Sequence, residues 1–166
     1  MEKLGEIKEV EVEVKPVLAA QVDLQSAGTS GIASALPPAF EVLTRFMRAH
    51  GLAPIAPPRT IYQTCDPALT TFTVAFPIAS RPKGLTDETA FVAELPGGTF
   101  MRFEHIGPYE QLGNTYDAIA AHLAEKGLLK SAHDWSKFMP MFEEYLNDPE
   151  NTLPDQLRVN IYLPVR

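Results

Sequence analysis

The chain has 166 residues, 45% of them hydrophobic, which is enough for one domain with a sizeable core or for two small fused modules. Its net charge of −7 and its scattered Lys and Arg exclude the basic face of a typical duplex-DNA binder, so we expect no direct nucleic-acid partner. The single cysteine, Cys65, excludes an internal disulfide, and a charged N-terminus excludes a signal peptide. No apolar run approaches a membrane span of about 20 residues. Together these features predict a cytoplasmic protein without membrane association.

The first half of the chain predicts a strand, a helix and two further strands, in that order. Residues 6–25 alternate charged and apolar side chains, which indicates one strand with a wet face. A flexible break is expected at residues 26–31 and a helix at residues 35–51. Two short strands follow at residues 59–64 and 70–78, around a turn at Asp-Pro. In the second of these strands the alternating residues Phe72, Val74, Phe76 and Ile78 form an apolar face.

The predicted helix at residues 35–51 has identifiable ends. Pro37 and Pro38 suit a first helical turn, and Gly51 suits the C-terminal cap. Apolar residues recur at helical spacing and form the face expected to pack on the sheet: Ala39, Val42, Leu43, Phe46 and Met47.

The second half repeats this order. Residues 97–106 predict a strand, residues 108–126 a helix that ends at Gly127, and residues 141–147 and 157–165 two more strands. In both halves Gly-Leu ends the helix, Asp-Pro follows the third element, and an apolar-Pro-apolar sequence closes the last strand. The shared order indicates an internal duplication.

We therefore predict an α+β fold made of duplicated β-α-β-β modules. The sheet should be mainly antiparallel, with two main helices on one face and a ligand cleft between the modules. We expect a single domain over residues 1–166, with module one at about 7–79 and module two at about 98–166. A connector at about 80–97 contains "FVAELPGG", which can add an edge strand.

Two acidic residues in the predicted strand "MFEEYLN" require an explanation. Strand alternation places Glu143 on one face and Glu144 on the other, so each face carries one carboxylate. An enclosed carboxylate must be paired, protonated or available to a cation; the alternative is that one faces solvent and the other lies near an edge. Aromatic rings beside such a carboxylate would suit a cationic or amphipathic ligand. The available rings are Tyr62, Phe100, Tyr109, Trp135 and Tyr162, for most of which core packing is the simpler role. Alternation in the last strand points Tyr162 and Asn160 away from the apolar face.

Three segments, "FEHIGPYEQL", "FEEYLNDP" and "LRVNIYLPV", resemble the GyrI-like small-molecule-binding family, which includes the effector-binding domains of multidrug-responsive transcription activators. The resemblance covers nearly the whole chain. It implies a pocket between the modules for lipophilic cations, with Glu143 as the pocket acid and with Tyr62, Tyr109, Trp135, Tyr145 and Tyr162 as ligand-binding residues. Because the first module starts near residue 1, we expect no helix-turn-helix before it.

The resemblance leaves two alternative functions open. Some stand-alone relatives hydrolyse strained cyclopropane-containing electrophiles, in which case Glu143 would be the general base and Tyr145 or Tyr162 would polarise the substrate. The other alternative is a protein-binding inhibitor of a topoisomerase-like partner. The acidic segments "EVEVE" and "EEYLNDPE" could supply the contact surface.

No metal or cofactor site is expected. The four histidines, His50, His105, His122 and His133, lack metal-ligand spacing. Cys65 has no neighbouring His or Lys that would activate it as a nucleophile. Haem binding is suggested only by another family that shares the duplicated architecture, which is an analogy of fold alone.

Overall fold

The computed structural model describes residues 7–13, 15–25, 29–62, 69–79, 91–95, 97–148 and 150–165. Its elements, in chain order, are β1 (Lys8–Val12), β2 (Lys15–Gln25), α1 (Thr29–Ala49), β3 (Arg59–Tyr62), β4 (Leu69–Pro77), β5 (Phe91–Leu95), β6 (Gly98–Ile106), η1 (Tyr109–Gln111), α2 (Leu112–Glu125), η2 (Ala132–Phe138), β7 (Met141–Tyr145), η3 (Pro154–Gln156) and β8 (Arg158–Pro164). Cys65 and the predicted Asp66-Pro67 turn lie outside the described residues.

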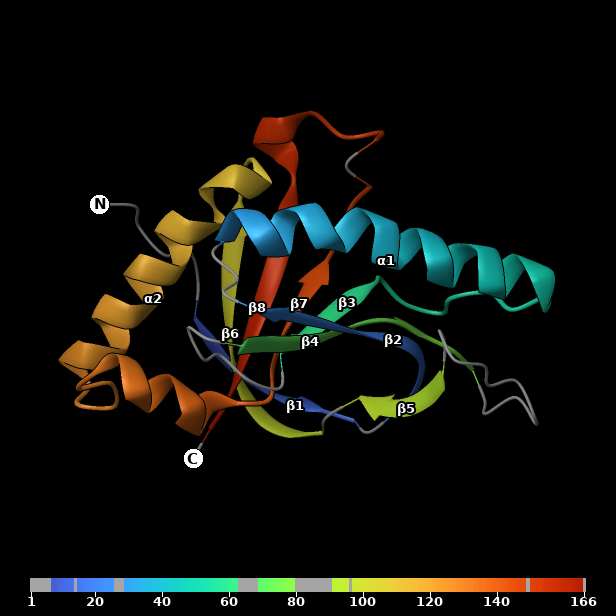
Figure 1. Ribbon diagram of the computed structural model, residues 1–166. Coiled ribbons are helices and arrows are strands. Elements are labelled where there is room, and N and C mark those ends of the chain that lie inside the picture. The colour runs from blue at the N-terminus through green and yellow to red at the C-terminus, as the bar shows by residue number, and fades with distance from the viewer. Residues whose placement is uncertain are drawn as a thin grey trace.

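All described strands join one eight-stranded antiparallel sheet in the order β1-β6-β8-β7-β3-β4-β2-β5. The two β-α-β-β units are visible in this order, because β2, β3 and β4 form one block and β6, β7 and β8 form the other. Among the described strands, the two blocks are joined in the sheet by the pairing of β3 with β7. Both α1 and α2 lie on the same side of the sheet (Figure 1). The predicted α+β class and antiparallel sheet are confirmed, while the module boundaries stay a prediction.

The N-terminal region differs from the prediction of one strand over residues 6–25. It forms two strands that pair with different partners, since β1 pairs with β6 of the second block and β2 pairs with β4 and β5. Side-chain alternation fixes which face a residue is on and not which strand it pairs with, so it cannot reveal where the chain changes partner. The expected extra strand of the connector is confirmed as β5, which pairs with β2 alone at the end of the sheet.

The first helix also begins earlier than predicted. It starts at Thr29, so Pro37 and Pro38 lie inside it and not in its first turn. Proline fixes φ near the helical value and removes only its own N–H bond, so a helix that packs on a sheet can continue through it at a cost. The added residues 29–34 are Thr-Ser-Gly-Ile-Ala-Ser, so helix propensity does not account for the extension toward the N-terminus. The 3₁₀ helix η2 was not predicted at all.

The second helix begins at Leu112, after the 3₁₀ turn η1, and not at residue 108 as predicted. The C-terminal glycine caps of both helices are as predicted. Gly51 and Gly127 have φ of 64° and 71°, values that glycine adopts without the penalty of a Cβ. In each cap the leucine after the glycine donates its backbone N–H to the carbonyl oxygen five residues earlier. The bonds run from Leu52 to Met47 and from Leu128 to Leu123, and both are 2.9 Å long. Both helices therefore end in the same Schellman-type cap, which supports the duplication.

Both faces of the sheet are covered. The helix face carries the larger apolar cluster, which includes Leu43, Phe72, Phe103 and Ile161. The opposite face carries a smaller cluster of Ile61, Ala75, Phe100, Phe142 and Tyr162. Val10 and Val12 of β1 and Ala93 of β5 pack against this second cluster, so strands from both ends of the sheet approach it.

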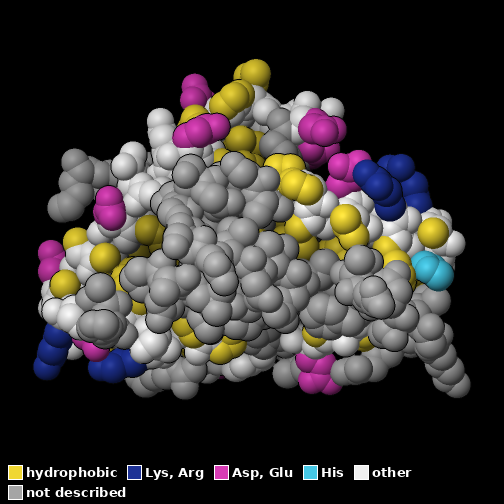
Figure 2. All heavy atoms as spheres, viewed as in Figure 1, with side chains coloured by type: hydrophobic (Ala, Val, Ile, Leu, Met, Phe, Trp, Pro, Cys, Tyr) yellow, Lys and Arg dark blue, Asp and Glu magenta, His cyan; other side chains and the backbone are white. Residues whose placement is uncertain are grey.

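The helix face is seen in Figure 2, where charged side chains lie mainly around the outline and hydrophobic ones lie closer to the centre. Among the described residues, no helix is long and apolar enough to span a membrane.

Candidate functional site

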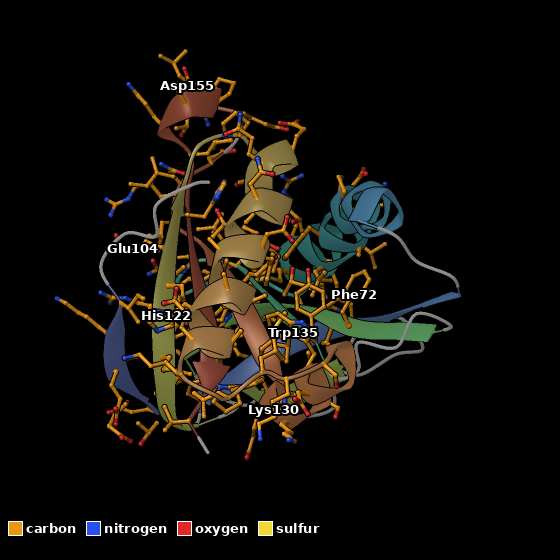
Figure 3. The ribbon with its side chains drawn as sticks, turned by 90° about the vertical axis from the view of Figure 1, so that its left-hand side faces the viewer. Phe72, Glu104, His122, Lys130, Trp135 and Asp155 are labelled. Carbon is orange, nitrogen blue, oxygen red and sulfur yellow. The ribbon has the colours of Figure 1, made fainter. Side chains whose placement is uncertain are left out.

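The centre of the sheet contains two buried carboxylates on consecutive residues of β7. Glu143 is 3% exposed and Glu144 is 8% exposed. As strand alternation predicts, they project from opposite faces of the sheet. The side chains that donate hydrogen bonds to Glu143 differ from those that bind Glu144. Figure 3 views the molecule from the side: Phe72, from the helix face, lies toward α1, and Glu104, from the other face, lies toward β1.

Glu143 is surrounded by tyrosine hydroxyls on the helix face. Tyr145 donates to its Oε1 at 2.7 Å and Tyr62 donates to the same oxygen at 3.3 Å. Tyr116 donates to Oε2. The hydroxyls of Tyr145 and Thr60 are 2.8 Å apart, which fixes the Tyr145 ring further. None of the ion pairs found between described residues involves Glu143.

The pairing of β3 with β7 explains this arrangement. Thr60 lies directly opposite Glu143 in the antiparallel register, and Tyr62 lies opposite Met141. Residues two apart on a strand share a face, so Tyr62 and Tyr145 both flank Glu143 on the helix side. Tyr116 comes from α2, which covers this face. The cluster therefore combines β3 of the first block with β7 and α2 of the second.

More rings surround the tyrosines that bind Glu143. Tyr109 and Phe40 contact Tyr145 at ring-centroid distances of 5.8 and 6.1 Å. Trp135 lies 6.5 Å from Tyr116. The Tyr109 hydroxyl is enclosed and has no hydrogen-bond partner among the described residues.

Burial is the main cause of the pKa shifts of Glu143 and the tyrosines around it. Burial raises the pKa of Glu143 above its ordinary value, and hydrogen bonds from Tyr116, Tyr145 and Tyr62 lower the pKa by less. Burial and the neighbouring Glu143 charge raise the pKa values of Tyr116 and Tyr145 well above 10.0, so both hydroxyls remain donors. The pKa of Tyr109 is raised as well, first by burial and then by Asp148 and Glu143.

Glu144 has a different set of partners on the opposite face. Its Oε2 accepts from Arg59 Nη2 at 2.5 Å, which makes a buried ion pair. Its Oε1 accepts from the Tyr162 hydroxyl at 3.0 Å and from Asn160 Nδ2 at 3.4 Å. Burial and the charge of Glu144 raise the pKa of Tyr162. The charge of Glu144 is therefore compensated within the protein.

Most of the predicted site residues come together, with one exception. Tyr62 and Tyr145 bind Glu143, and Tyr109 and Trp135 lie in the next layer of rings. The expectation that Tyr162 shares a pocket with Glu143 is not met, because Tyr162 projects from the other face and binds Glu144. Side-chain alternation in the last strand predicts that Tyr162 lies away from the helix face, whereas the family resemblance grouped Tyr162 with Glu143. The structure agrees with the alternation.

Sequence reasoning missed Tyr116 and Arg59. Tyr116 lies on the predicted helix of the second half, where helical spacing alone does not distinguish a site residue from a core residue. A buried tyrosine usually needs a partner for its hydroxyl, and this requirement would have pointed to a nearby acceptor. No local pattern marks Arg59, whose partner lies 85 residues away.

The Gly-Pro-Tyr turn is held by His105. Nε2 of His105 donates to the Pro108 carbonyl at 3.1 Å, since a carbonyl can only accept, and Nδ1 lies 2.6 Å from the Thr115 hydroxyl. Gly107, with a φ of 130°, makes the reversal and donates to the Leu157 carbonyl. These bonds fix the start of α2 and hence the position of Tyr109 beside Tyr145. The described residues contain no group of three potential metal ligands.

The sequence model of the GyrI-like small molecule binding domain matches residues 66–166, and the chain belongs to this family. No curated protein matches the chain in sequence.

Solved structures with the same fold include regulators and a hydrolase. The EcmrR C-terminal domain has a TM-score of 0.72 and 18% identity, with 97% of each chain covered. In the EcmrR–DNA complex this chain spans only 57% of the EcmrR chain. SAV2435 bound to tetraphenylphosphonium has a TM-score of 0.67 and 12% identity, with 98% of this chain and 94% of that chain covered. A hydrolase from Listeria innocua has a TM-score of 0.53 and 14% identity, with 97% and 92% covered.

Proposed function

We propose that this chain binds small lipophilic organic cations beside Glu143, at the junction of its two modules. The observation that carries the proposal is a buried carboxylate that receives three tyrosine hydroxyls and takes part in no ion pair found between described residues. A buried negative charge without a counter-ion is costly, and an organic cation would supply that counter-ion. The surrounding rings would add cation–π attraction.

The comparison with SAV2435 supports this ligand class, since that protein is bound to tetraphenylphosphonium. A phosphonium ion has no N–H donors and attracts a carboxylate by charge alone. This suits Glu143, whose two oxygens already accept three hydrogen bonds and offer little room for an ammonium donor.

The test is a titration of tetraphenylphosphonium and of the neutral, similarly shaped triphenylphosphine oxide. Trp135, the only tryptophan, lies beside Tyr116 and reports binding by fluorescence. Glu143→Gln should weaken phosphonium binding by about 30-fold or more, because buried charge pairs contribute about 2–5 kcal/mol. Binding of the neutral oxide should change by less than about threefold.

Glu125→Gln is the matched control, because it removes one negative charge from an exposed position of α2. It should leave both affinities unchanged. Equal weakening by the two variants would mean that net charge and not a local carboxylate attracts the cation. Equal affinity of wild type and Glu143→Gln for the phosphonium would remove Glu143 from the site.

A second candidate is hydrolysis of strained cyclopropane-containing electrophiles. It is favoured by the raised pKa of Glu143, which a general base at neutral pH requires, and the Listeria innocua hydrolase shares the fold. Glu143 would take a proton from water as the water oxygen bonds to a cyclopropane carbon. The ring C–C bond would break, and its electron pair would pass to a conjugated carbonyl, which Tyr145 would polarise. The resulting enolate would then take the proton back from Glu143, which gives the hydrated product and restores the carboxylate.

Mass spectrometry separates the two candidates. Incubation with a cyclopropane-bearing alkylating agent should give a product heavier by one water over many turnovers if the protein is an enzyme. The rate should rise with pH through the ionisation of Glu143 and be lost in Glu143→Gln. Stoichiometric binding without a hydrated product would leave only the binding function.

A further inference from the structure

The sheet face opposite the helices carries polar side chains that the proposed cation site does not use. Together with Phe142 they form two neighbouring rows that run across β6, β8, β7 and β3, as the strand register shows. The first row contains Arg102, Tyr162 and Phe142, and the second contains Glu104, Asn160, Glu144 and Arg59. All seven side chains therefore face away from α1, α2 and Glu143.

Three polar atoms of these rows are buried without a hydrogen-bond partner among the described residues. They are Oδ1 of Asn160, Nε of Arg59 and Nε of Arg102. Asn160 is only 7% exposed. Buried polar atoms are normally paired, so two free donors and one free acceptor on one face indicate missing partners. A molecule that supplies two acceptors and one donor would satisfy all three.

The charge of the rows selects the kind of molecule. The rows contain two acids: Glu144 pairs with Arg59 at 2.5 Å, and Glu104 lies 4.0 Å from Arg158 beside the rows. No ion pair found between described residues involves Arg102, so its charge is not balanced by either acid. The face thus offers a positive charge in a chain whose net charge is −7. An oxyanion accepts from guanidinium N–H groups and compensates this charge, which a cation cannot do.

Aromatic rings lie between the two arginines. Phe142 and Tyr162 are stacked with centroids 4.4 Å apart and planes at 13°. Phe100 meets them edge-on at 5.3 and 6.4 Å. Arg59 lies 5.9 Å above the Phe142 ring. A planar aromatic ligand has both apolar and ring-stacking partners here.

We propose that this face is a second binding site, which takes an aromatic carboxylate that carries a hydroxyl or amino group. The carboxylate accepts from the guanidinium groups, Arg102 first, and the hydroxyl or amino group donates to Oδ1 of Asn160. The row reaches the edge of the sheet at Lys8 of β1, an exposed residue opposite Arg102, where the ligand enters. This site is independent of the cation site, because the sheet separates them.

The probe is 4-hydroxybenzoate, with its methyl ester as the uncharged control, measured by calorimetry and by NMR shifts of backbone amides. Saturable binding of one 4-hydroxybenzoate is expected, with shifts in β6 and β8, and the ester should bind at least about tenfold more weakly because it lacks the charged acceptor. Arg102→Met should weaken 4-hydroxybenzoate by about tenfold or more.

Asn160→Leu provides a second test of the proposed site, because it changes a neutral side chain and leaves the charges of the face unaltered. The substitution removes the unpaired Oδ1 together with the long bond from Nδ2 to Glu144 at 3.4 Å, so the melting temperature with ligand is compared with that of the unliganded variant. The increase in melting temperature caused by 4-hydroxybenzoate should be lost. A merely structural amide would leave that ligand-induced increase unchanged.

Glu143→Gln separates this site from the cation site. It should leave 4-hydroxybenzoate binding intact, and tetraphenylphosphonium should bind the wild type together with 4-hydroxybenzoate. Failure of phosphonium binding alone would overturn the proposed function and not this inference. No saturable 4-hydroxybenzoate binding, unchanged affinity in Arg102→Met, or competition with the phosphonium would overturn the second site.

Discussion

Glu143 and Glu144 are neighbours in sequence and almost equally buried, yet the two faces of the sheet stabilise them by different means. Glu144 meets a guanidinium at 2.5 Å, so its charge is neutralised within the fold. Glu143 meets only neutral hydroxyls in the contacts found, and burial raises its pKa. The comparison teaches that burial alone does not mark a functional carboxylate. The absence of an internal cation, within the described contacts, distinguishes Glu143 as the candidate.

The largest effect is expected when Arg59 is replaced by methionine. Glu144 would then be buried without its counter-ion, and the free energy of unfolding should fall by about 3–5 kcal/mol, measured by urea denaturation. The double variant Arg59→Met with Glu144→Met removes both charges and should regain most of this loss. A single-variant loss below about 1 kcal/mol would mean that Tyr162 and Asn160 suffice to hold Glu144.

A smaller loss is expected for Tyr116→Phe, which removes a donor to Glu143. Hydrogen bonds to charged groups contribute about 1.5–3 kcal/mol, and the free energy of unfolding at neutral pH should fall by that amount. Tyr109→Phe is the control, because its hydroxyl has no partner among the described residues. Equal losses in the two variants would contradict the assigned role of Tyr116.

The contribution of Glu143 to the free energy of unfolding should depend on pH. An acid whose pKa is higher in the folded than in the unfolded protein binds more protons when folded. The free energy of unfolding therefore falls as pH rises from the ordinary value of 4.5 through the raised pKa of Glu143. Glu143→Gln lacks this group, so the stability of wild type relative to the variant should fall as pH increases across this range. Urea denaturation at a series of pH values measures it, and a rising difference would reverse the sign of the pKa shift.

Tyr162→Phe should have the smallest effect. Glu144 keeps Arg59, so the loss of one hydroxyl donor should lower the free energy of unfolding by about 0.5–1.5 kcal/mol. The affinity for tetraphenylphosphonium should not change, since Tyr162 lies on the other face. Tyr145→Phe, measured in the same titration, should change that affinity. If Tyr162→Phe changed the affinity for tetraphenylphosphonium and Tyr145→Phe did not, the cation would bind on the face of Glu144 and not on the face of Glu143.

Local sequence patterns determined much of this fold. The repeated order of strands and helices, the two glycine caps and the opposite orientation of Glu143 and Glu144 follow from periodicity and backbone preference, which act over a few residues. Glu143 was named as the pocket acid through a family resemblance, and Tyr62 and Tyr145 were named with it. These residues lie together in the structure.

Only the tertiary structure decided which side chain meets which carboxylate. Tyr62 reaches Glu143 across 81 residues and Arg59 reaches Glu144 across 85, through the β3–β7 pairing that joins the modules. The same holds for Tyr116, whose hydroxyl depends on where α2 docks, and for β1, which pairs with the second block. Alternation fixes the face of a residue but not its partner strand, because strand pairing is set by packing between segments far apart in the chain.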